Sequence, residues 1–139
     1  MKLNKKHPLY REDINNVLSL VNTKELQGKS FLITGATGMV GVMLIDVLMS
    51  IKDVKVYAVG RNKGKAKTRL GDYFDEPRFF FVEQDVCSPF DDTIKVDYII
   101  PMASNTHPLA YSQFPIETML INIQGAINAL NHAEKCGAT

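Results

Sequence analysis

The sequence predicts an α/β fold in which four parallel strands form one sheet flanked by helices. Short apolar runs alternate along the chain with longer segments of helical periodicity, and this repetition is typical of parallel pairing with right-handed crossovers. The apolar runs are nearly continuous, as expected for strands buried on both faces. With 139 residues, 45% hydrophobic and 22% charged, the chain fits one globular domain. The expected strands are residues 31–34, 54–59, 79–82 and 96–100.

The segment before the first strand reads as a helical extension. Ile14, Val17, Leu18 and Val21 recur at helical spacing within residues 9–27, which predicts a short amphipathic helix lying against the following domain. We therefore divide the chain into an N-terminal helical extension, residues 1–28, and the sheet domain, residues 29–139.

Three further helices are expected between and after the strands, at residues 39–50, 63–70 and 115–135. Pro115 suits the start of the last one, and Gly137 lies where a C-terminal cap belongs. Its apolar stripe is expected to pack against the sheet. The stripe consists of Leu120, Ile123, Ile127 and Leu130.

Composition and charge exclude several classes of function. A formal net charge of +1 gives no reason to expect a nucleic-acid partner. No apolar run has the length of a signal peptide or a membrane span, which favours a cytoplasmic protein without membrane contact. Cys87 and Cys136 lie far apart in the sequence, so they indicate neither a disulfide framework nor a zinc site.

The most informative motif is Gly35-Ala-Thr37-Gly38-Met39-Val40-Gly41, directly after the first strand. A diphosphate needs backbone N–H groups with no side chain in the way, and a tight turn at a helix N-terminus supplies them together with the helix dipole. Gly35 would allow the turn, Gly38 would let phosphate approach the backbone, and Gly41 would let the helix pack closely on the strand. A second phosphate motif, Gly28-Lys29-Ser30, fails because it precedes the strand and Thr23 stands where a P-loop has glycine.

The stretch from Thr34 to Gly41 resembles the fingerprint of the extended short-chain dehydrogenase/reductase family, which includes nucleotide-sugar epimerases, dehydratases and decarboxylases. The likeness extends from about Lys29 to Gly137. It implies a Rossmann-type sheet with strand order 3-2-1-4 and a bound NAD or NADP.

The residues after the second strand bear on the choice of cofactor. NAD-binding proteins usually have an acidic residue there for the ribose hydroxyls, whereas this chain has Arg61 and Asn62. Arg61 could pair with the 2′-phosphate of NADP, although nucleotide-sugar members of the family mostly keep NAD. The alternative is a solvated basic start of the following helix, with Lys63, Lys65 and Lys67.

Two more strand ends resemble cofactor-binding positions of the family. Asp85 and Val86, after the third strand, are similar to its pair at the adenine pocket, although an aspartate after a strand is also a common turn residue. Met102, Ala103 and Ser104, after the fourth strand, lie where the chain passes the ribose and nicotinamide half.

Polar residues farther along the chain have weaker counterparts in the family. Ser104, Asn105 and Thr106 resemble residues that line its sugar pocket, although a polar loop needs no such role. Asn122 and Gly125 match a family element that supports the active-site loop, although a buried helix asparagine can simply satisfy backbone groups.

Family members use a Tyr-x-x-x-Lys pair to move a proton as hydride goes to the nicotinamide, and none of the five tyrosines here is followed by lysine at that spacing. We therefore expect the chain to be the N-terminal, cofactor-binding part of such an enzyme, ending before the fifth strand and inactive alone. We also expect self-association into a homo-oligomer, through the exposed edge of the fourth strand or through the last helix.

The resemblance implies that the parent enzyme acts on a nucleotide sugar, as a 4,6-dehydratase, a 4-epimerase or a UDP-glucuronate decarboxylase. The alternatives are a non-catalytic NAD(P)-binding regulatory module and an NADP-dependent carbonyl reductase. Arg61 slightly favours the reductase.

Overall fold

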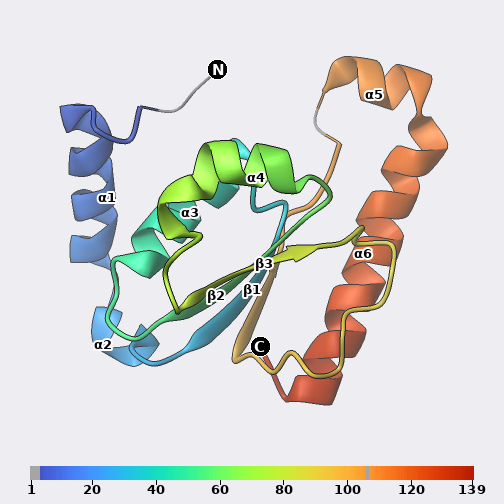
Figure 1. Cartoon of the computed structure of the whole chain (residues 1–139). Coiled ribbons are helices and arrows are strands. Elements are labelled where there is room, and N and C mark those ends of the chain that lie inside the picture. The colour runs from blue at the N-terminus through green and yellow to red at the C-terminus, as the bar shows by residue number, and fades with distance from the viewer. Residues whose placement is uncertain (1–3, 106) are drawn as a thin grey trace.

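The computed structural model describes residues 4–105 and 107–139, and at its centre lies one sheet of four parallel strands (Figure 1). The strand order is β3-β2-β1-β4, which confirms the predicted topology. β1 pairs with β2 on one side and with β4 on the other, so that Leu32 lies opposite both Tyr57 and Ile99. The strands are β1 (Ser30–Thr34), β2 (Lys55–Gly60), β3 (Phe79–Glu83) and β4 (Tyr98–Pro101).

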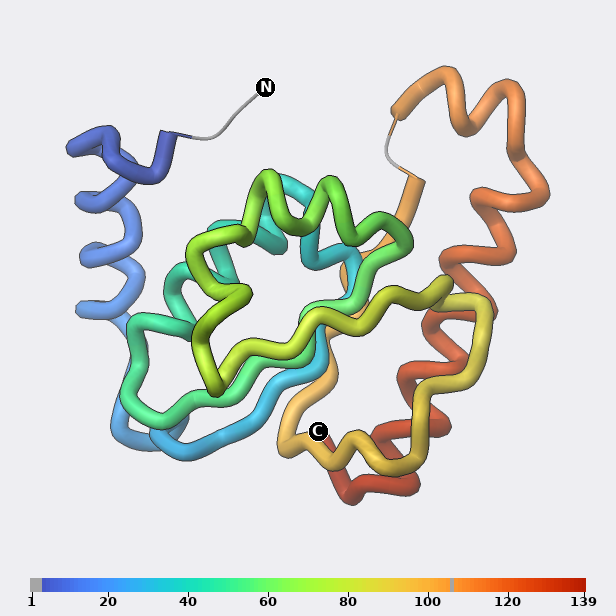
Figure 2. Tube along the Cα trace, viewed as in Figure 1, coloured from blue at the N-terminus to red at the C-terminus, as the bar shows by residue number. Residues whose placement is uncertain are grey.

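Helices cover both faces of the sheet (Figures 1 and 2). On one face lie α3 (Met39–Met49), α4 (Lys63–Leu70) and the short 3-10 helix η1 (Gly71–Tyr73), and on the other lies α6 (Pro115–Cys136). Alternate β1 residues feed the two cores, since Phe31 and Ile33 belong to the cluster under α3 whereas Leu32 belongs to the cluster under α6. β1 is therefore buried on both faces, and most of β2 is buried as well. The edge strands β3 and β4 are only partly buried, with Phe80 40% exposed, so the expectation of burial on both faces was wrong for them.

The N-terminal extension forms two helices, α1 (Pro8–Leu20) and α2 (Thr23–Leu26), where the sequence predicted one. The backbone is extended at Val21, which separates them. α1 packs on the outer side of α3 (Figure 1). Ile14 is the only α1 residue that is buried, whereas Val17 and Leu18 are half-buried and Val21 is exposed. The apolar face of α1 therefore covers less of the domain than its spacing suggested.

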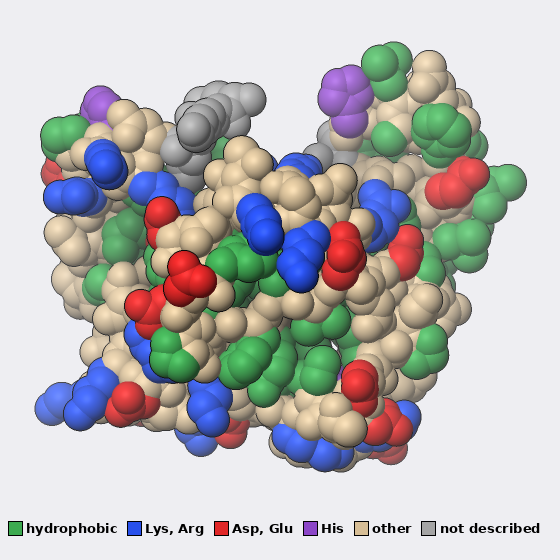
Figure 3. Space-filling view, viewed as in Figure 1, with side chains coloured by type: hydrophobic (Ala, Val, Ile, Leu, Met, Phe, Trp, Pro, Cys, Tyr) green, Lys and Arg blue, Asp and Glu red, His purple; other side chains and the backbone are tan. Residues whose placement is uncertain are grey.

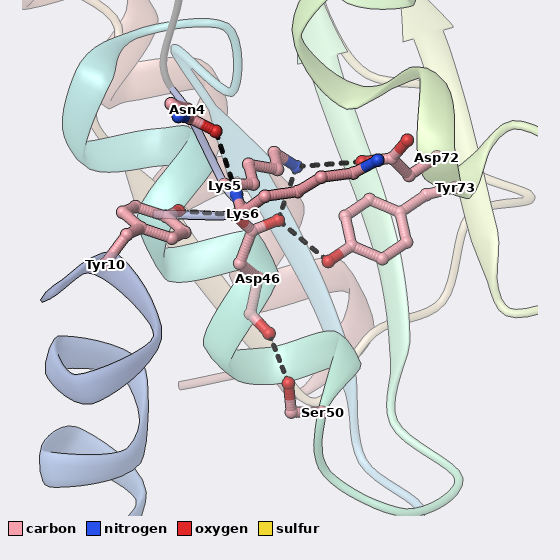
Figure 4. A network of polar contacts seen from close by, with 8 residues as sticks. All are labelled: Asn4, Lys5, Lys6, Tyr10, Asp46, Ser50, Asp72 and Tyr73. Atoms are coloured by element: carbon pink, nitrogen blue, oxygen red, sulfur yellow. Dashed lines mark hydrogen bonds and ion pairs between the residues drawn. The ribbon is translucent and has the colours of Figure 1, made fainter. Parts of the chain in front are cut away.

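A cluster of polar groups around Asp46 joins the extension to the domain (Figure 4). Asp46 is 5% exposed. Its carboxylate accepts hydrogen bonds from Lys5 Nζ at 2.6 Å, from the Tyr10 hydroxyl, and from the Tyr73 hydroxyl at 2.8 Å. Lys5 also lies over the Tyr73 ring, 4.8 Å from its centroid. We call Lys5, Tyr10, Asp46 and Tyr73 the Asp46 cluster.

Pairing within the cluster satisfies the buried carboxylate, which would be costly to bury alone. The same surroundings make the two phenols harder to deprotonate. Burial, together with the hydrogen bonds to Asp46, raises the pKa of Tyr10 and Tyr73 above the ordinary tyrosine value. Both therefore act as donors with a fixed proton.

A short helix that the sequence did not predict, α5 (Pro108–Gln113), precedes α6. It begins at a His-Pro-Leu sequence, as α1 does. In each case the histidine is the N-cap, since Nδ1 of His7 accepts from the Leu9 N–H and Nδ1 of His107 accepts from the Leu109 N–H, both at 3.3 Å. The following proline fits the first helical position. The cap was missed because histidine is not among the usual N-cap residues.

The packing face of α6 differs from the expected one, and that prediction was wrong. Leu120, Ile123, Ile127 and Leu130 are exposed and lie on the outer side of the helix, where Figure 3 shows hydrophobic side chains. Apart from Ile121, the sheet side carries small or polar residues, and the small ones let the helix lie close to the strands. It consists of Thr118, Ile121, Gly125, Asn128, Ala129 and His132.

The end of α6 agrees with the predicted cap, because Gly137 has a left-handed φ of 68°. The chain then turns back to β4. The Thr139 N–H donates to the Asp97 carbonyl at 2.9 Å, and the Ile99 N–H donates to the Thr139 carbonyl at 3.0 Å. The outer edge of β4 is thus paired at this point, where the sequence predicted free backbone groups. Self-association itself stays a prediction.

Candidate functional site

A cleft of about 510 Å³ lies at the carboxyl ends of the strands, where ligands bind in open parallel sheets. The glycine-rich turn forms one wall, and the segments after β2, β3 and β4 form the others. Except for Asn62, every residue that the sequence analysis assigned to the cofactor lines it. Those residues are Gly35, Thr37, Gly38, Met39, Val40, Gly41, Arg61, Asp85, Val86, Met102, Ala103 and Ser104.

The turn between β1 and α3 can be built only with glycine at two of its positions. Gly35 has a φ of 67°, and a Cβ there would lie 2.7 Å from the Met102 carbonyl oxygen. A Cβ on Gly41 would lie 2.6 Å from the Gly35 carbonyl oxygen, so α3 packs directly on the turn. At Gly38 the nearest atom would be the Gly35 oxygen at 3.1 Å. Gly35 and Gly41 therefore do what the sequence analysis assigned to them.

The first turn of α3 presents free backbone donors to the cleft. Gly38 is the N-cap and offers no side chain, and the first helical hydrogen bond runs from the Val42 N–H to the Gly38 carbonyl at 3.1 Å. Among the described residues, the N–H groups of Met39, Val40 and Gly41 have no backbone acceptor. With the positive end of the helix dipole behind them, these amides suit an anionic group.

Thr34 closes the turn against β4. Its side chain is buried, and its hydroxyl oxygen accepts hydrogen bonds from the Met102 and Ala103 N–H groups, each at 3.0 Å. These bonds hold the segment after β4 against the turn. Met102, Ala103 and Ser104 therefore line the cleft as the continuation of β4.

Two cations border the cleft near the end of β2, and in Figure 3 Lys and Arg side chains gather over α4. Arg61 and Lys65 both line it, and Arg61 forms an ion pair of 3.8 Å with Asp85, which follows the neighbouring strand β3. Both partners are exposed, Arg61 at 62% and Asp85 at 44%, so the pair is weak and open to competition from a ligand. Asn62 instead caps α4, where its side-chain oxygen accepts from the Lys65 N–H at 2.7 Å.

The Asp85–Val86 segment is held from two sides. The Asp85 carboxylate accepts from the Cys87 N–H at 2.9 Å, and the buried Asn128 side chain donates to the Val86 carbonyl at 2.8 Å. Gly125 leaves room for this contact, because its Cβ would lie 3.1 Å from Val86 Cγ2. Burial, with a hydrogen bond to Asp85, raises the pKa of the Cys87 thiol, which keeps it protonated near neutral pH.

Asn122 is exposed, which rules out the alternative that it is buried and satisfies backbone groups. Its support of an active-site loop stays a prediction. Asn128 is instead the asparagine of α6 that is buried and contacts a segment beside the cleft, through the Val86 carbonyl. Helical spacing could have found it once the sheet-facing side of α6 was known.

Several residues around the cleft were not assigned to the cofactor in advance, although Asn105 and Thr106 were expected at the sugar pocket. Asn105 lines the cleft and donates to the Thr118 hydroxyl at 3.2 Å, while Thr106 lies outside the described residues. Lys65 was treated only as part of a basic segment, although it follows Arg61 by one helical turn. The remaining lining residues are Val59, Gly60, Gln84 and Ile121.

Metal and membrane chemistry find no support in the described part of the chain. Residues 4–105 and 107–139 contain no group of three or more His, Cys, Asp or Glu side chains that could hold a metal ion. Over the same residues, no helix is both long and apolar enough for a membrane span.

Comparison with known proteins gives consistent matches. Residues 31–139 match the sequence profile of the NAD dependent epimerase/dehydratase family. UDP-glucuronic acid decarboxylase 6 of Arabidopsis thaliana is 31% identical over 120 residues, which cover 86% of this chain and 34% of the plant protein. UDP-glucuronic acid decarboxylase 1 of Danio rerio is 33% identical over 118 residues, covering 82% and 27%. The chain thus spans about a third of the length of such relatives.

Solved structures share the fold. The enzyme WbmF of Bordetella bronchiseptica, solved in complex with NAD⁺, superimposes with a TM-score of 0.64 at 17% identity, over 81% of this chain and 34% of that chain.

Proposed function

Because the chain belongs to the NAD dependent epimerase/dehydratase family, we propose that the cleft binds NAD, with the diphosphate on the first turn of α3. One observation carries the proposal. Among the described residues, the amides of Met39, Val40 and Gly41 have no backbone acceptor, and they lie beside a turn in which a Cβ at Gly35 or Gly41 would collide with backbone. Such a cradle fits a diphosphate, which needs several donors and close backbone approach.

The other walls of the cleft suit the rest of a dinucleotide. Asp85 and Val86 would hold the adenine, the segment after β2 would face the adenosine ribose, and Met102 to Ser104 would border the nicotinamide half. A bound nicotinamide would supply reversible hydride transfer. This chain's own residues would bind and orient the cofactor, while Thr34 would keep the segment after β4 at a fixed distance from the turn.

We further propose that the whole protein modifies a nucleotide sugar. The support is the similarity to UDP-glucuronic acid decarboxylases over most of the chain. A decarboxylase is therefore our first proposal, ahead of a 4-epimerase or a 4,6-dehydratase.

NADP is the second candidate cofactor, and the positions of Arg61 and Lys65 favour it. Both cations line the same part of the cleft, where a 2′-phosphate could displace Asp85 from its pair with Arg61. Fluorescence titration of the chain with NADH and NADPH separates the two. If NADPH is the ligand, Arg61→Ala should weaken NADPH binding by more than tenfold while leaving NADH binding nearly unchanged.

The diphosphate cradle is tested by Val40→Asp. Val40 is 66% exposed, so the substitution is tolerated, and an acidic residue in the first helical turn stabilises the helix by about 0.3–1 kcal/mol. The same carboxylate would repel a diphosphate and occupy the free amides. NADH affinity should fall by at least about tenfold, equivalent to about 1.4 kcal/mol, while the melting temperature holds or rises.

Val40→Asn is the matched control, because it has nearly the same shape without the charge. It should reduce NADH affinity much less than Val40→Asp does. Equal NADH affinity of Val40→Asp and the unmodified chain would contradict diphosphate binding at this turn.

A further inference from the structure

The side chain of Arg69 reaches from the last turn of α4 to the glycine-rich turn. Its guanidinium Nη1 donates a hydrogen bond to the Thr37 carbonyl, across 32 residues of sequence. Arg69 is half-buried, and Ala66 and Leu70 anchor the same helix in the core. Among the described residues, the cations that line the cleft are Arg61 and Lys65. Arg69 therefore reaches the turn from outside the cleft.

The carbonyl that Arg69 holds has a competing partner within the backbone. If α3 began one residue earlier, the Thr37 carbonyl would accept from the Gly41 N–H, four residues on. In the structure the helix instead begins with the bond from Val42 to Gly38. The Gly41 N–H therefore has no backbone acceptor in the described part of the chain, and the Thr37 carbonyl accepts from a charged donor of another helix.

The peptide unit after Thr37 is fixed at both of its polar atoms. Its carbonyl oxygen accepts from Arg69, and its Gly38 N–H donates to the Gly35 carbonyl at 2.8 Å. A peptide unit is planar, so these two bonds set its orientation. The backbone that leads into the three free amides is thereby fixed as well.

We propose that Arg69 is a positioning residue for the diphosphate: by holding the Thr37 carbonyl, it keeps the first turn of α3 open and its amides free for the ligand. This inference rests on the proposed dinucleotide function of the same turn. Arg69 acts through Thr37 and has no contact of its own with the ligand.

The first test compares Arg69→Met with Lys67→Met in the full chain. Both variants remove one positive charge from α4, and Lys67 is exposed, so the pair separates the hydrogen bond from general attraction of anions. Loss of a hydrogen bond with a charged donor should lower NADH affinity in Arg69→Met by about tenfold or more, against less than about threefold in Lys67→Met. Arg69→Lys, which retains a charged donor, should recover part of the affinity.

Adenosine provides the internal control, because it occupies the nucleoside part of the cleft and has no phosphate. Its affinity, measured by chemical-shift titration, should be the same in Arg69→Met and the unmodified chain. Parallel losses of NADH and adenosine binding in Arg69→Met would overturn the proposal, as would an NADH affinity equal to that of Lys67→Met.

Hydrogen exchange of the Gly41 amide gives a readout that needs no ligand. In Arg69→Met the released Thr37 carbonyl should capture the Gly41 N–H and slow its exchange severalfold relative to the unmodified chain and Lys67→Met. Unchanged Gly41 exchange would overturn the role of Arg69. If Arg69→Met does not fold, the same comparison is made with Arg69→Lys, where a smaller slowing is expected.

Failure of the proposed function gives a different result. The unmodified chain would then bind no NADH, while the Gly41 exchange would still report whether Arg69 controls the start of α3.

Discussion

Two regions of α3 treat polar groups in opposite ways. In the middle of the helix, the buried Asp46 carboxylate has three donors from three other segments of the chain. At the N-terminus of α3, the amides of Met39, Val40 and Gly41 lie beside an open cleft and find no backbone acceptor within residues 4–105 and 107–139. One helix thus combines a fully paired cluster that holds the fold together with an unpaired end that is available to a ligand.

The difference separates stability from binding. Buried polar groups must be paired within the protein, because an unpaired one costs free energy. Donors that face solvent can remain without a protein partner until a ligand binds, at little cost in free energy. Substitutions in the Asp46 cluster should therefore reduce the free energy of unfolding without affecting ligand affinity. Substitutions at the glycine-rich turn should reduce ligand affinity, either alone or together with the free energy of unfolding.

Asp46→Ala should have the largest effect on stability. It removes the buried acceptor and leaves the Lys5 ammonium without its main partner, which should cost about 3–5 kcal/mol in the free energy of unfolding. Urea denaturation measures this value. NADH affinity of the folded fraction should stay within about twofold, since none of the four cluster residues is among the described residues that line the cleft.

Asp72→Ala is the matched control for Asp46→Ala. Asp72 also pairs with Lys5, at 3.9 Å, but its side chain is 77% exposed, so its removal should cost at most about 0.5 kcal/mol. A loss below about 1 kcal/mol in Asp46→Ala would show that the cluster is not the main attachment of the extension.

Gly41→Ala should have an intermediate effect on stability and also reduce binding, because Gly41 both packs α3 on the turn and supplies one of the amides that face the cleft. The new Cβ would collide with the Gly35 and Ala36 carbonyl oxygens, at 2.6 and 2.9 Å, and force α3 away from β1. We expect a loss of about 1–3 kcal/mol and weaker NADH binding, measured by thermal denaturation and titration.

Gly71→Ala controls for the loss of glycine flexibility. Gly71 has a φ of −54° and no atom near a Cβ, so alanine there should be neutral or raise stability by up to about 1 kcal/mol. The interpretation of Gly41 fails if both variants melt at the same temperature.

The smallest effect on the free energy of unfolding is expected at Asp97. Its exposure lies between that of the buried Asp46 and that of the exposed Asp72. Its side chain is 40% exposed, and hydrogen bonds from the Ser30 N–H and hydroxyl, both 2.8 Å, lower the pKa of Asp97 below its usual value. Since the folded-state pKa lies below that of the unfolded chain, this contribution is complete above about pH 4. It is lost as the pH falls through the folded-state pKa.

Asp97→Asn isolates that contribution, because Asp91 and Asp92 also have a lowered pKa and titrate in the same range. The difference in unfolding free energy between the unmodified chain and Asp97→Asn should shrink as the pH falls below about 4. A difference that stays constant from pH 7 to pH 2.5 would exclude a titrating role for Asp97.

Local sequence patterns predicted most of the sheet and the cleft. Four apolar runs alternating with helical segments predicted a parallel sheet, and the family resemblance implied its strand order. The carboxyl ends of parallel strands meet at one edge. The glycines, Arg61, Asp85 and Met102 therefore came together as expected. Asn62 did not join them, because its short side chain satisfies the start of α4 instead.

Features that depend on contacts between distant segments were not predictable in this way. α6 is apolar on one face and carries small and polar residues on another, and periodicity alone does not tell which face meets the sheet. The bond from Arg69 to Thr37 and the donors of Asp46 depend on three-dimensional packing. No local signal marks Lys5 or Tyr10 as a partner of Asp46.

The Asp46 cluster also has a consequence for folding kinetics. Lys5, Tyr10 and Tyr73 are 41, 36 and 27 residues away from Asp46 in the sequence, so loops must close before the carboxylate has its donors. We therefore expect these contacts to form after the transition state for folding, so that they act mainly on the unfolding rate. The cluster should therefore lower the unfolding rate more than it raises the folding rate.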